Sequence, residues 1–335
     1  MKVSLIVSVY NVSKYIERCL KSVLEQTLDD IEIVVVNDAT TDDSMDKMYN
    51  LLEDYPSRNN QVVVINHDRN LGISKVREDG FNAAKGDYIQ FVDGDDFLDI
   101  NMAEVLYNKA TETHADMVIC DFYRYDGMQS RPDSIVRGKD KLDINSVRDD
   151  IINRSVPPFI WCRLIKRELL EGDEMMWPVM NLGEDTVIGS QVAYRAIKIE
   201  YVNRPLYYYR YNPSSVTHQF DELHCLENYE SFKANVGIYI SFLEREELSN
   251  KYSRGIVINK LRTKNRLLPL TRQRKYRRLW WSTYPEINRV LLFGNKDFKS
   301  TYRERLWIAA IMSGLYPRFR NHLMKRKFSV SSEWL

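Results

Sequence analysis

The sequence predicts an α/β protein with a Rossmann-like, mostly parallel sheet that carries helices on both faces and is followed by a basic helical region. Three observations lead to this prediction. Short β-branched runs alternate with helical patterns in the first part of the chain. The chain has 335 residues, of which 44% are hydrophobic and 28% charged, so it can bury a full core. Its positive charge is concentrated toward the C-terminus.

The alternation follows a regular order along the chain. It reads as a strand over 3–10, a helix over 13–26, a strand over 31–37, a helix after residue 41, a strand over 61–66, a helix over 73–84 and a strand over 87–93. Apolar strands separated by helices are typical of βαβ units, whose parallel sheet is covered on both faces. Thr41 or Asp42 is expected to cap the second helix, and Asp43 to favour its positive end.

Polar side chains follow the predicted strands at the point where each strand ends. They are Tyr10 and Asn11, Asn37 and Asp38, and Asp93 to Asp96. In open α/β sheets, ligands bind outside the carboxyl ends of the strands. Asp93 and Asp95 lie two residues apart in a turn that contains Gly94. Both carboxylates can therefore reach one hard divalent cation and leave coordination positions for diphosphate oxygens.

Other interpretations of this acid cluster compete with a ligand site. The simplest is an exposed acidic turn before a helix that starts at about Asn101, and Asp96 is expected to cap that helix. An EF-hand calcium loop is excluded, because Phe97 and Leu98 occupy the places of a ligand and an obligatory glycine. A dinucleotide-binding dehydrogenase is disfavoured, since no G-x-G-x-x-G follows the first strand.

Four segments in order carry a resemblance to a known family: SLIVSVYN, VVVNDATTDDS, NLGISKVREDGFNAAKGDYIQFVDGDD and NLGEDTVIGSQ. Together they resemble the inverting family 2 glycosyltransferases of the GT-A fold, over about residues 1–217. The resemblance implies a nucleotide-sugar donor, with a UDP-sugar favoured, and a D-x-D pair that holds Mn²⁺ or Mg²⁺. It implies inverting transfer to a saccharide or lipid-linked acceptor in cell-surface polysaccharide or glycolipid synthesis. A non-catalytic nucleotide-binding or scaffold protein of the same fold is the alternative.

The resemblance also implies roles for individual residues. Asp185 is expected to be the catalytic base and Glu184 to orient the acceptor. The metal ligands are expected to be Asp95 and Asp93. The nucleotide-sugar is expected to contact Val9, Tyr10, Asn11, Asp38, Arg77, Asp93 and Gly94, with Tyr10 beside the base and Asp38 accepting from the uracil imide or a ribose hydroxyl. Trp161, as a wall rather than a core residue, and Arg163 are expected on the acceptor side.

Two further positions depend on the same comparison. Glu78 stands where the family often has asparagine, and its acid can either repel a diphosphate or pair with Arg77. His218, which ends the segment PLYYYRYNPSSVTH, can reach the metal or the diphosphate, although a lone loop histidine is more often solvated. The nucleotide-sugar domain is expected to span 1–217, and the helical basic region 218–335.

The C-terminal region differs in charge from the rest of the chain. From Arg254 onward there are 20 Lys and Arg against 4 Asp and Glu, a net of +16, so the preceding residues carry −15. Cations alternate there with the aromatic residues Trp280, Trp281, Trp307 and Tyr316. Such sequence suits an anionic membrane surface. Nucleic-acid binding uses the same charges but is not expected, and a bundle with a solvated basic face is the remaining alternative.

The cellular location follows from cysteine usage and hydropathy. The four cysteines form no C-x-x-C pair, so thiols in a reducing cytosol are expected. No apolar run reaches the roughly 18 residues that span a bilayer, and no small-residue cleavage site follows the first strand. The protein is expected in the cytoplasm, either free or peripheral at the inner face of the cytoplasmic membrane.

Overall fold

The computed structural model describes residues 1–135, 144–212, 220–295 and 302–314. The chain divides into two compact units. The first, called the α/β unit below, consists of Met1–Ile152 and Val156–Asn212. The second, the helical unit, consists of Asn153–Ser155 and the chain from Pro213 onward. The boundary expected after residue 217 falls outside the described residues.

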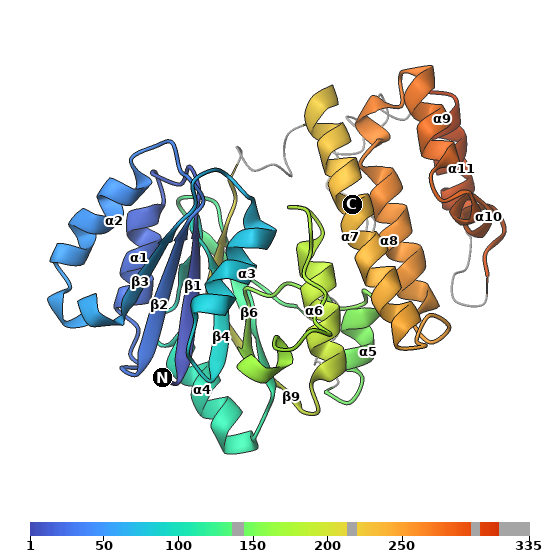
Figure 1. Ribbon diagram of the computed structural model, residues 1–335. Helices are drawn as coiled ribbons and strands as arrows, with labels where there is room; N and C mark the ends of the chain where they lie inside the picture. The colour runs from blue at the N-terminus through green and yellow to red at the C-terminus, as the bar shows by residue number, and fades with distance from the viewer. Residues whose placement is uncertain (136–143, 213–219, 296–301, 315–335) are drawn as a thin grey trace. The chain divides into compact units, whose positions relative to one another are not determined.

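The α/β unit is built around one mixed sheet (Figure 1). Its strands are β1 (Val3–Val9), β2 (Ile31–Asn37), β3 (Val62–Asn66), β4 (Tyr88–Asp93), β5 (Phe97–Leu98), β6 (Met117–Tyr125), β7 (Ser130–Asp133), β8 (Arg163–Lys166) and β9 (Ile199–Arg210). Their order is β3-β2-β1-β4-β8-β6-β9-β5, with β7 paired to β6. The first four strands are parallel, as the alternation predicts. The other half adds antiparallel pairings of β8, β7 and β5, which the local pattern did not indicate.

Helices cover both sides of the parallel strands. They are α1 (Ile16–Leu24), α2 (Ser44–Glu53), α3 (Ile73–Ala83), α4 (Met102–Thr113), α5 (Val147–Ile152) and α6 (Glu184–Arg195). Figure 1 shows α1 and α2 on one side of β1 to β3 and α3 on the other. Helix α1 begins at Ile16 and not at residue 13, because a turn precedes it in which Tyr15 N donates to the Val12 carbonyl at 2.7 Å. Val12 N donates to Ser44 Oγ and Ser13 N to Asp42 Oδ2. Asp42 also accepts from Ser44 N, at 3.1 Å.

The parallel register brings the strand ends together at one edge of the sheet. Val9 pairs with Asn37, Ser8 with Asp93, and Asn37 with Asn66. Helix α3 lies very close to this edge, because Gly80 allows it: a Cβ there would come within 2.4 Å of Ile6 Cγ2. The polar residues after β1, β2 and β4 therefore gather on one rim, and α3 carries Arg77 toward it.

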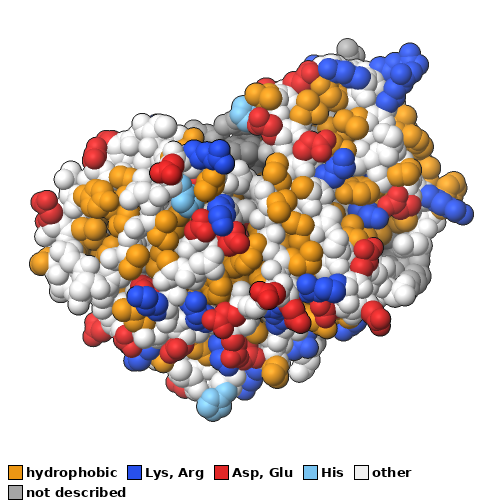
Figure 2. Space-filling model, in the orientation of Figure 1, with side chains coloured by type: hydrophobic (Ala, Val, Ile, Leu, Met, Phe, Trp, Pro, Cys, Tyr) orange, Lys and Arg blue, Asp and Glu red, His pale blue; other side chains and the backbone are white. Residues whose placement is uncertain are grey.

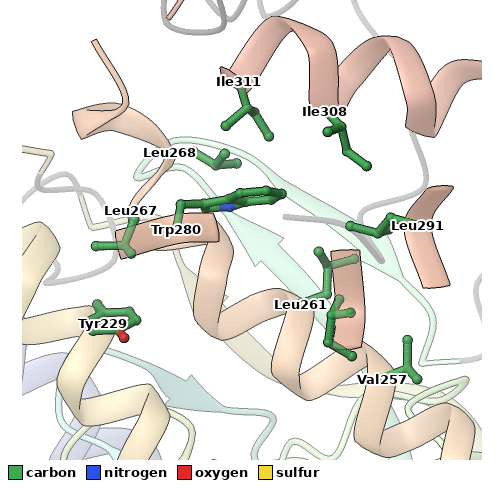
Figure 3. Packing of buried hydrophobic residues seen from close by; sticks show 10 residues of the cluster. Tyr229, Val257, Leu261, Leu267, Leu268, Trp280, Leu291, Ile308 and Ile311 are labelled. Carbon is green, nitrogen blue, oxygen red and sulfur yellow. The ribbon is translucent and has the colours of Figure 1, made fainter. Parts of the chain in front are cut away.

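The helical unit has its own core. Its helices are α7 (Glu222–Arg245), α8 (Ser253–Asn265), α9 (Arg274–Ser282), α10 (Pro285–Phe293) and α11 (Tyr302–Met312). Asp221 caps α7 by accepting from His224 N at 3.1 Å. Figure 3 shows the Trp280 ring lying among Leu268, Ile308 and Ile311. Trp280 is fully buried, so helix packing, and not an interface, explains it.

The aromatic residues expected at a membrane surface therefore have different environments. Trp280 belongs to the core, and Trp307 is partly buried against the same cluster. Trp281 is 38% exposed, whereas Tyr316 lies outside the described residues. Figure 2 shows Lys and Arg side chains projecting from the end of the helical unit near α9, with hydrophobic side chains between them. Within the described parts of the chain, no helix is long and apolar enough to cross a membrane. All four cysteines are buried, and none of them forms a disulfide bond.

Candidate active site

The D-x-D turn joins β4 to β5 and packs directly against the end of β1. Gly94 is required for this approach, because a Cβ there would lie 2.3 Å from the Ser8 carbonyl oxygen. Asp95 Oδ2 accepts from Asn212 Nδ2 at 3.0 Å. Burial raises the pKa of Asp95, the Asn212 hydrogen bond opposes this rise, and the charge of Asp93 adds to it. The turn thus places the carboxylates of Asp93 and Asp95 close together, and nearby groups do not fully balance their negative charges.

Asp96 has a different role from the helix cap expected for it. Its buried carboxylate accepts from Tyr207 Oη at 2.8 Å and from Arg210 N at 2.6 Å. Helix α4 instead follows Asn101 and has no side-chain cap. Burial, followed by repulsion from Asp95 and Asp93, raises the pKa of Asp96 well above its usual value. Asp96 fixes the D-x-D turn against β9 from inside the unit.

Arg210, at the end of β9, is a site residue that sequence reasoning missed. Its Nε donates to the Asp95 carbonyl at 2.8 Å. Its guanidinium lies 4.8 Å from the ring centre of Tyr15 and 4.7 Å from that of Tyr125. Stacking on aromatic faces holds an arginine in one orientation. The segment PLYYYRYNPSSVTH was a signal for this position, since it places an arginine at the end of the strand that pairs with β5.

The E-D pair begins α6. Gly183 adopts φ 86°, a conformation open to glycine, and Glu184 and Asp185 form the first helical turn after it. The two side chains are 14% and 19% exposed. Burial raises the pKa of Glu184 to about 7, and the adjacent charge of Asp185 contributes to the rise. Burial also raises the pKa of Asp185, and Arg77 is the strongest opposing influence. Both carboxyls of the pair thus have a pKa above the ordinary value, which is the direction that favours proton acceptance by a general base.

Arg77 lies between the E-D pair and the D-x-D turn. Its Nη1 donates to Glu184 Oε1 at 2.8 Å and to Asp185 Oδ1 at 3.2 Å, and its Nη2 to Asp93 Oδ1 at 3.1 Å. The Arg77 side chain is only 4% exposed. All these partners are carboxylates of this chain, whereas the sequence predicted a cation that faces the nucleotide. Glu78 does not pair with Arg77: its carboxylate binds Lys75 Nζ at 2.9 Å.

The carboxylate of Asp38 is hydrogen-bonded to the loop between β3 and α3. Its Oδ1 accepts from Leu71 N at 2.7 Å and lies 2.8 Å from His67 Nδ1, and its Oδ2 accepts from Gly72 N at 2.8 Å. The residue is 2% exposed. Asp38 was expected to receive a hydrogen bond from the nucleotide. In the structure, both of its oxygens instead shape the loop that leads into α3.

The end of β1 offers one free aromatic face. Tyr10 is 44% exposed, which suits a ring that stacks on a base. Val9 is buried, and its carbonyl accepts from Asp38 N at 2.9 Å. Asn11 adopts φ 51° and its Oδ1 accepts from Thr41 N at 3.1 Å. Val9 and Asn11 thus hold the strand end in place through hydrogen bonds, and the Tyr10 side chain is well exposed.

Trp161 and Arg163 are core residues, contrary to the expectation that Trp161 is a wall residue and Arg163 faces an acceptor. Trp161 is 4% exposed and stacks on Phe159, at 4.9 Å between ring centres. Arg163 is completely buried, and its Nη2 donates to the Pro157 carbonyl at 2.7 Å. The charge of Arg163 opposes the rise in the pKa of Asp185 that burial causes. Arg163 therefore acts on the E-D pair through its charge, whereas Trp161 belongs to the aromatic core of the unit.

The described acids fit a divalent cation that is shared with a ligand. Among the residues that the structure describes, no three His, Cys, Asp or Glu side chains cluster closely enough to hold a metal by themselves. Mg²⁺ is usually held by one or two carboxylates together with substrate phosphates. Asp95 and Asp93 supply hard oxygen donors of this kind, and the raised pKa of Asp95 shows a charge that a cation would compensate. His218 lies outside the described residues.

Sequence comparison assigns the family. The family model described as "Glycosyl transferase family 2" matches residues 4–171, half of the chain. The chain belongs to glycosyl transferase family 2. It is also similar to the "Uncharacterized glycosyltransferase EpsJ" of Bacillus subtilis (strain 168), with 35% identity over 225 residues. That match covers 64% of this chain and 62% of EpsJ, which is less than two thirds of the relative's length.

Solved structures share the fold. The crystal structure of S. aureus TarS 1-349 in complex with UDP has a TM-score of 0.55 and 18% identity, and the match covers 96% of this chain and 92% of that one. The mannosyltransferase PcManGT from Pyrobaculum calidifontis, in complex with GDP-Man and Mn2+, has a TM-score of 0.55 and 14% identity. That match covers 97% of this chain and 88% of the other. This family 2 glycosyltransferase therefore has the mixed α/β GT-A fold with a helical C-terminal region.

Proposed function

We propose that the α/β unit transfers a sugar, with inversion, from a UDP-sugar to an acceptor hydroxyl in a metal-dependent reaction. The observation that carries the proposal is that two pairs of acids, one in the D-x-D turn and one at the start of α6, lie close to the same arginine. The D-x-D turn and the E-D pair come from distant segments, yet Asp93 and Asp185 both bind Arg77. One pair is suited to the diphosphate side of a donor, and the other to an acceptor hydroxyl.

The residues divide the reaction between them. Asp185 takes the proton of the acceptor hydroxyl as that oxygen attacks the anomeric carbon from the side opposite the leaving diphosphate. Glu184 accepts a hydrogen bond from another group of the acceptor and so orients the acceptor. A divalent cation on Asp95 and Asp93, when bound, would stabilise the charge of the departing nucleoside diphosphate. In a single inverting displacement, no covalent intermediate on the protein is required.

The donor side uses the strand ends. The exposed Tyr10 ring stacks on the base, and Asp38 acts mainly by holding the loop that ends at Gly72. Arg210 lies beside the D-x-D turn, where a cation favours a diphosphate. UDP is supported as the nucleotide by the TarS complex, and Mn²⁺ or Mg²⁺ by the Mn2+ in PcManGT. The product is proposed to be a cell-surface polysaccharide or glycolipid, and the support is the similarity to the poly(ribitol-phosphate) beta-glucosyltransferase of Bacillus spizizenii.

The helical unit is proposed to bring the enzyme to an anionic membrane surface, at the inner face of the cytoplasmic membrane, where lipid-linked acceptors lie. Support comes from α9, whose exposed residues include Arg274, Arg278 and Trp281. Cations and a tryptophan on one helix suit the membrane interface. In the part of the chain that the structure describes, neither Arg274 nor Arg278 forms an ion pair with an acid.

A screen of donors tests the proposal directly. UDP-, GDP- and TDP-sugars are incubated with the protein and Mn²⁺ or Mg²⁺, and both hydrolysis and thermal stabilisation are measured. The expected result is turnover of a UDP-sugar that requires the cation and gives a product of inverted anomeric configuration. Retained configuration would contradict the proposed mechanism. Binding of UDP-sugars without turnover under any of these conditions would favour the scaffold alternative.

A further inference from the structure

We infer that Arg77 is a positioning residue that fixes the catalytic base relative to the donor site, and that it is not a ligand of the nucleotide. The inference rests on the proposed function, since it assigns Arg77 a task in that reaction. It begins from the contacts of one side chain. Arg77 binds Asp93 at the end of β4 and both members of the E-D pair at the start of α6.

The geometry uses the shape of a guanidinium. One terminal nitrogen, Nη1, serves Glu184 and Asp185, and the other, Nη2, serves Asp93. A planar fork can bind groups in two directions at once, whereas an ammonium is a single point charge. The side chain is 4% exposed, and its Nε is buried without a hydrogen-bond partner among the described residues. Little of Arg77 is therefore left to contact a ligand.

The charges explain why the site needs this cation. Three carboxylates of like charge lie around one point, and burial disfavours the ionised forms of Glu184 and Asp185. Burial alone would lower the pKa of Arg77, but Asp93, Asp185 and Glu184 raise it above the ordinary value. Arg77 is thus a permanent positive charge among the acids. Without it, the acids would repel one another and Asp185 would move away from its place on α6.

The position of Arg77 is itself fixed by the backbone. Gly80 lets α3 pack tightly on β1, and Ser74 Oγ donates to the Met180 carbonyl at 2.6 Å. Helix α3 therefore contacts both β1 and the segment that precedes α6. Arg77 on this helix therefore fixes Asp185, the base, relative to Asp93, which lies at the donor site. Loss of the Arg77 contacts should slow the chemical step more than it weakens donor binding, because misplacement of reacting groups mainly raises the activation barrier.

The test compares Arg77→Met with Arg77→Lys, and uses Lys75→Met as a matched control. Lys75 lies on the same helix and binds Glu78 and Asp79 instead of the catalytic acids. In Arg77→Met, kcat should fall by about 10²-fold or more, as for loss of a well-placed base, while calorimetric UDP affinity and donor KM change little. Arg77→Lys should recover part of kcat because the charge remains. Lys75→Met should behave like the wild type.

A double variant shows whether Arg77 acts through the base. If it does, Arg77→Met combined with Asp185→Asn should be no slower than Asp185→Asn alone. Losses that multiply, or an Arg77→Met protein that loses UDP affinity with kcat unchanged, would overturn the inference. If Arg77→Met fails to fold, the same comparison is made with Arg77→Lys and its double variant. An Asp185→Asn protein with normal transfer would instead refute the proposed function, so the two failures are distinguishable.

Discussion

Two buried cations, Arg77 in the α/β unit and Lys264 in the helical unit, have opposite surroundings. In the α/β unit, Arg77 lies among three carboxylates, which raise its pKa. In the helical unit, Lys264 is fully buried and donates to two neutral groups, the Thr283 carbonyl at 2.5 Å and Asn288 Oδ1 at 2.8 Å, with the Trp280 ring centre 4.2 Å from its nitrogen. Burial lowers the pKa of Lys264 to about 7.

The difference shows what each region is organised to do. Burying a charged group costs free energy unless the group is paired. A buried cluster of ionised groups is therefore expected where function needs it. The α/β unit keeps four charged groups together at the rim where ligands bind. The helical unit instead holds one lysine that is close to losing its proton, inside an apolar core around Trp280. The charged cluster around Arg77 thus indicates chemistry, and the single buried Lys264 indicates packing.

The largest expected effect comes from removing the acid that is least compensated. Asp95→Ala should abolish the part of UDP affinity that depends on Mn²⁺, because Asp95 is the carboxylate of the D-x-D turn that Arg77 does not bind. Calorimetry with and without Mn²⁺ measures this. Asp99→Ala, which removes an acid four residues farther along the chain, is the control and should keep the metal-dependent affinity. If the wild-type protein bound UDP equally well with and without Mn²⁺, donor binding would not depend on the metal and the assignment of Asp95 as its ligand would be wrong.

The core of the helical unit gives the next largest effect. Trp280→Ala should lower the free energy of unfolding by about 3–5 kcal/mol, because it removes a large buried side chain from a packed cluster. Trp281→Ala, one residue along the same helix and 38% exposed, should change it by less than about 0.5 kcal/mol. Urea unfolding of both variants provides the measurement. Equal losses would show that the helical core is not centred on Trp280.

The exposed basic face of α9 should give an intermediate effect on membrane binding. Arg274→Ala combined with Arg278→Ala should weaken binding to anionic vesicles by about 2 kcal/mol, since each cation near such a surface contributes roughly 1 kcal/mol. Sedimentation with vesicles measures this, and added salt should reduce the wild-type binding. Lys14→Ala with Lys85→Ala removes two exposed cations from the α/β unit as a control. A wild-type protein that does not sediment at low salt would leave the basic face as solvated surface.

The pH dependence of stability gives the smallest effect. The folded pKa of Lys264, about 7, is below its ordinary value of about 10.4, so the unfolded chain binds more protons between these limits. Stability should therefore rise with pH from about 7 to 10 by at least about 1.4 kcal/mol from this group. Lys264→Met should flatten that part of the wild-type curve. If the free energy of unfolding of the wild type and of Lys264→Met changed with pH in the same way, Lys264 would stay charged in the folded protein.

The sequence predicted the parts of the site that depend on local pattern. Apolar runs and the polar residues after them placed Tyr10, Asp38 and Asp93 at one edge of a parallel sheet, and the parallel register confirms this arrangement. What it could not predict were pairings between distant side chains. Arg77 meets acids more than a hundred residues away, and neither spacing nor composition records that contact.

Neighbouring residues of one type were equally hard to separate. Asp95 and Asp96 are adjacent acids, yet only Asp95 is available to a ligand, because Tyr207 and Arg210 occupy the carboxylate of Asp96. Trp280 and Trp281 likewise differ only in which side of α9 they occupy. Burial is decided by how elements pack, which a single sequence shows only through periodicity.

The central claim is that Asp185, held by Arg77, is the base of a sugar transfer. The most direct test is Asp185→Asn, which keeps the shape of the side chain but cannot accept a proton as a carboxylate does. The account predicts that UDP and metal binding persist in this variant while the transfer rate falls by about 10²- to 10⁴-fold. A variant that transfers sugar at a near wild-type rate would contradict the claim and direct attention to Glu184.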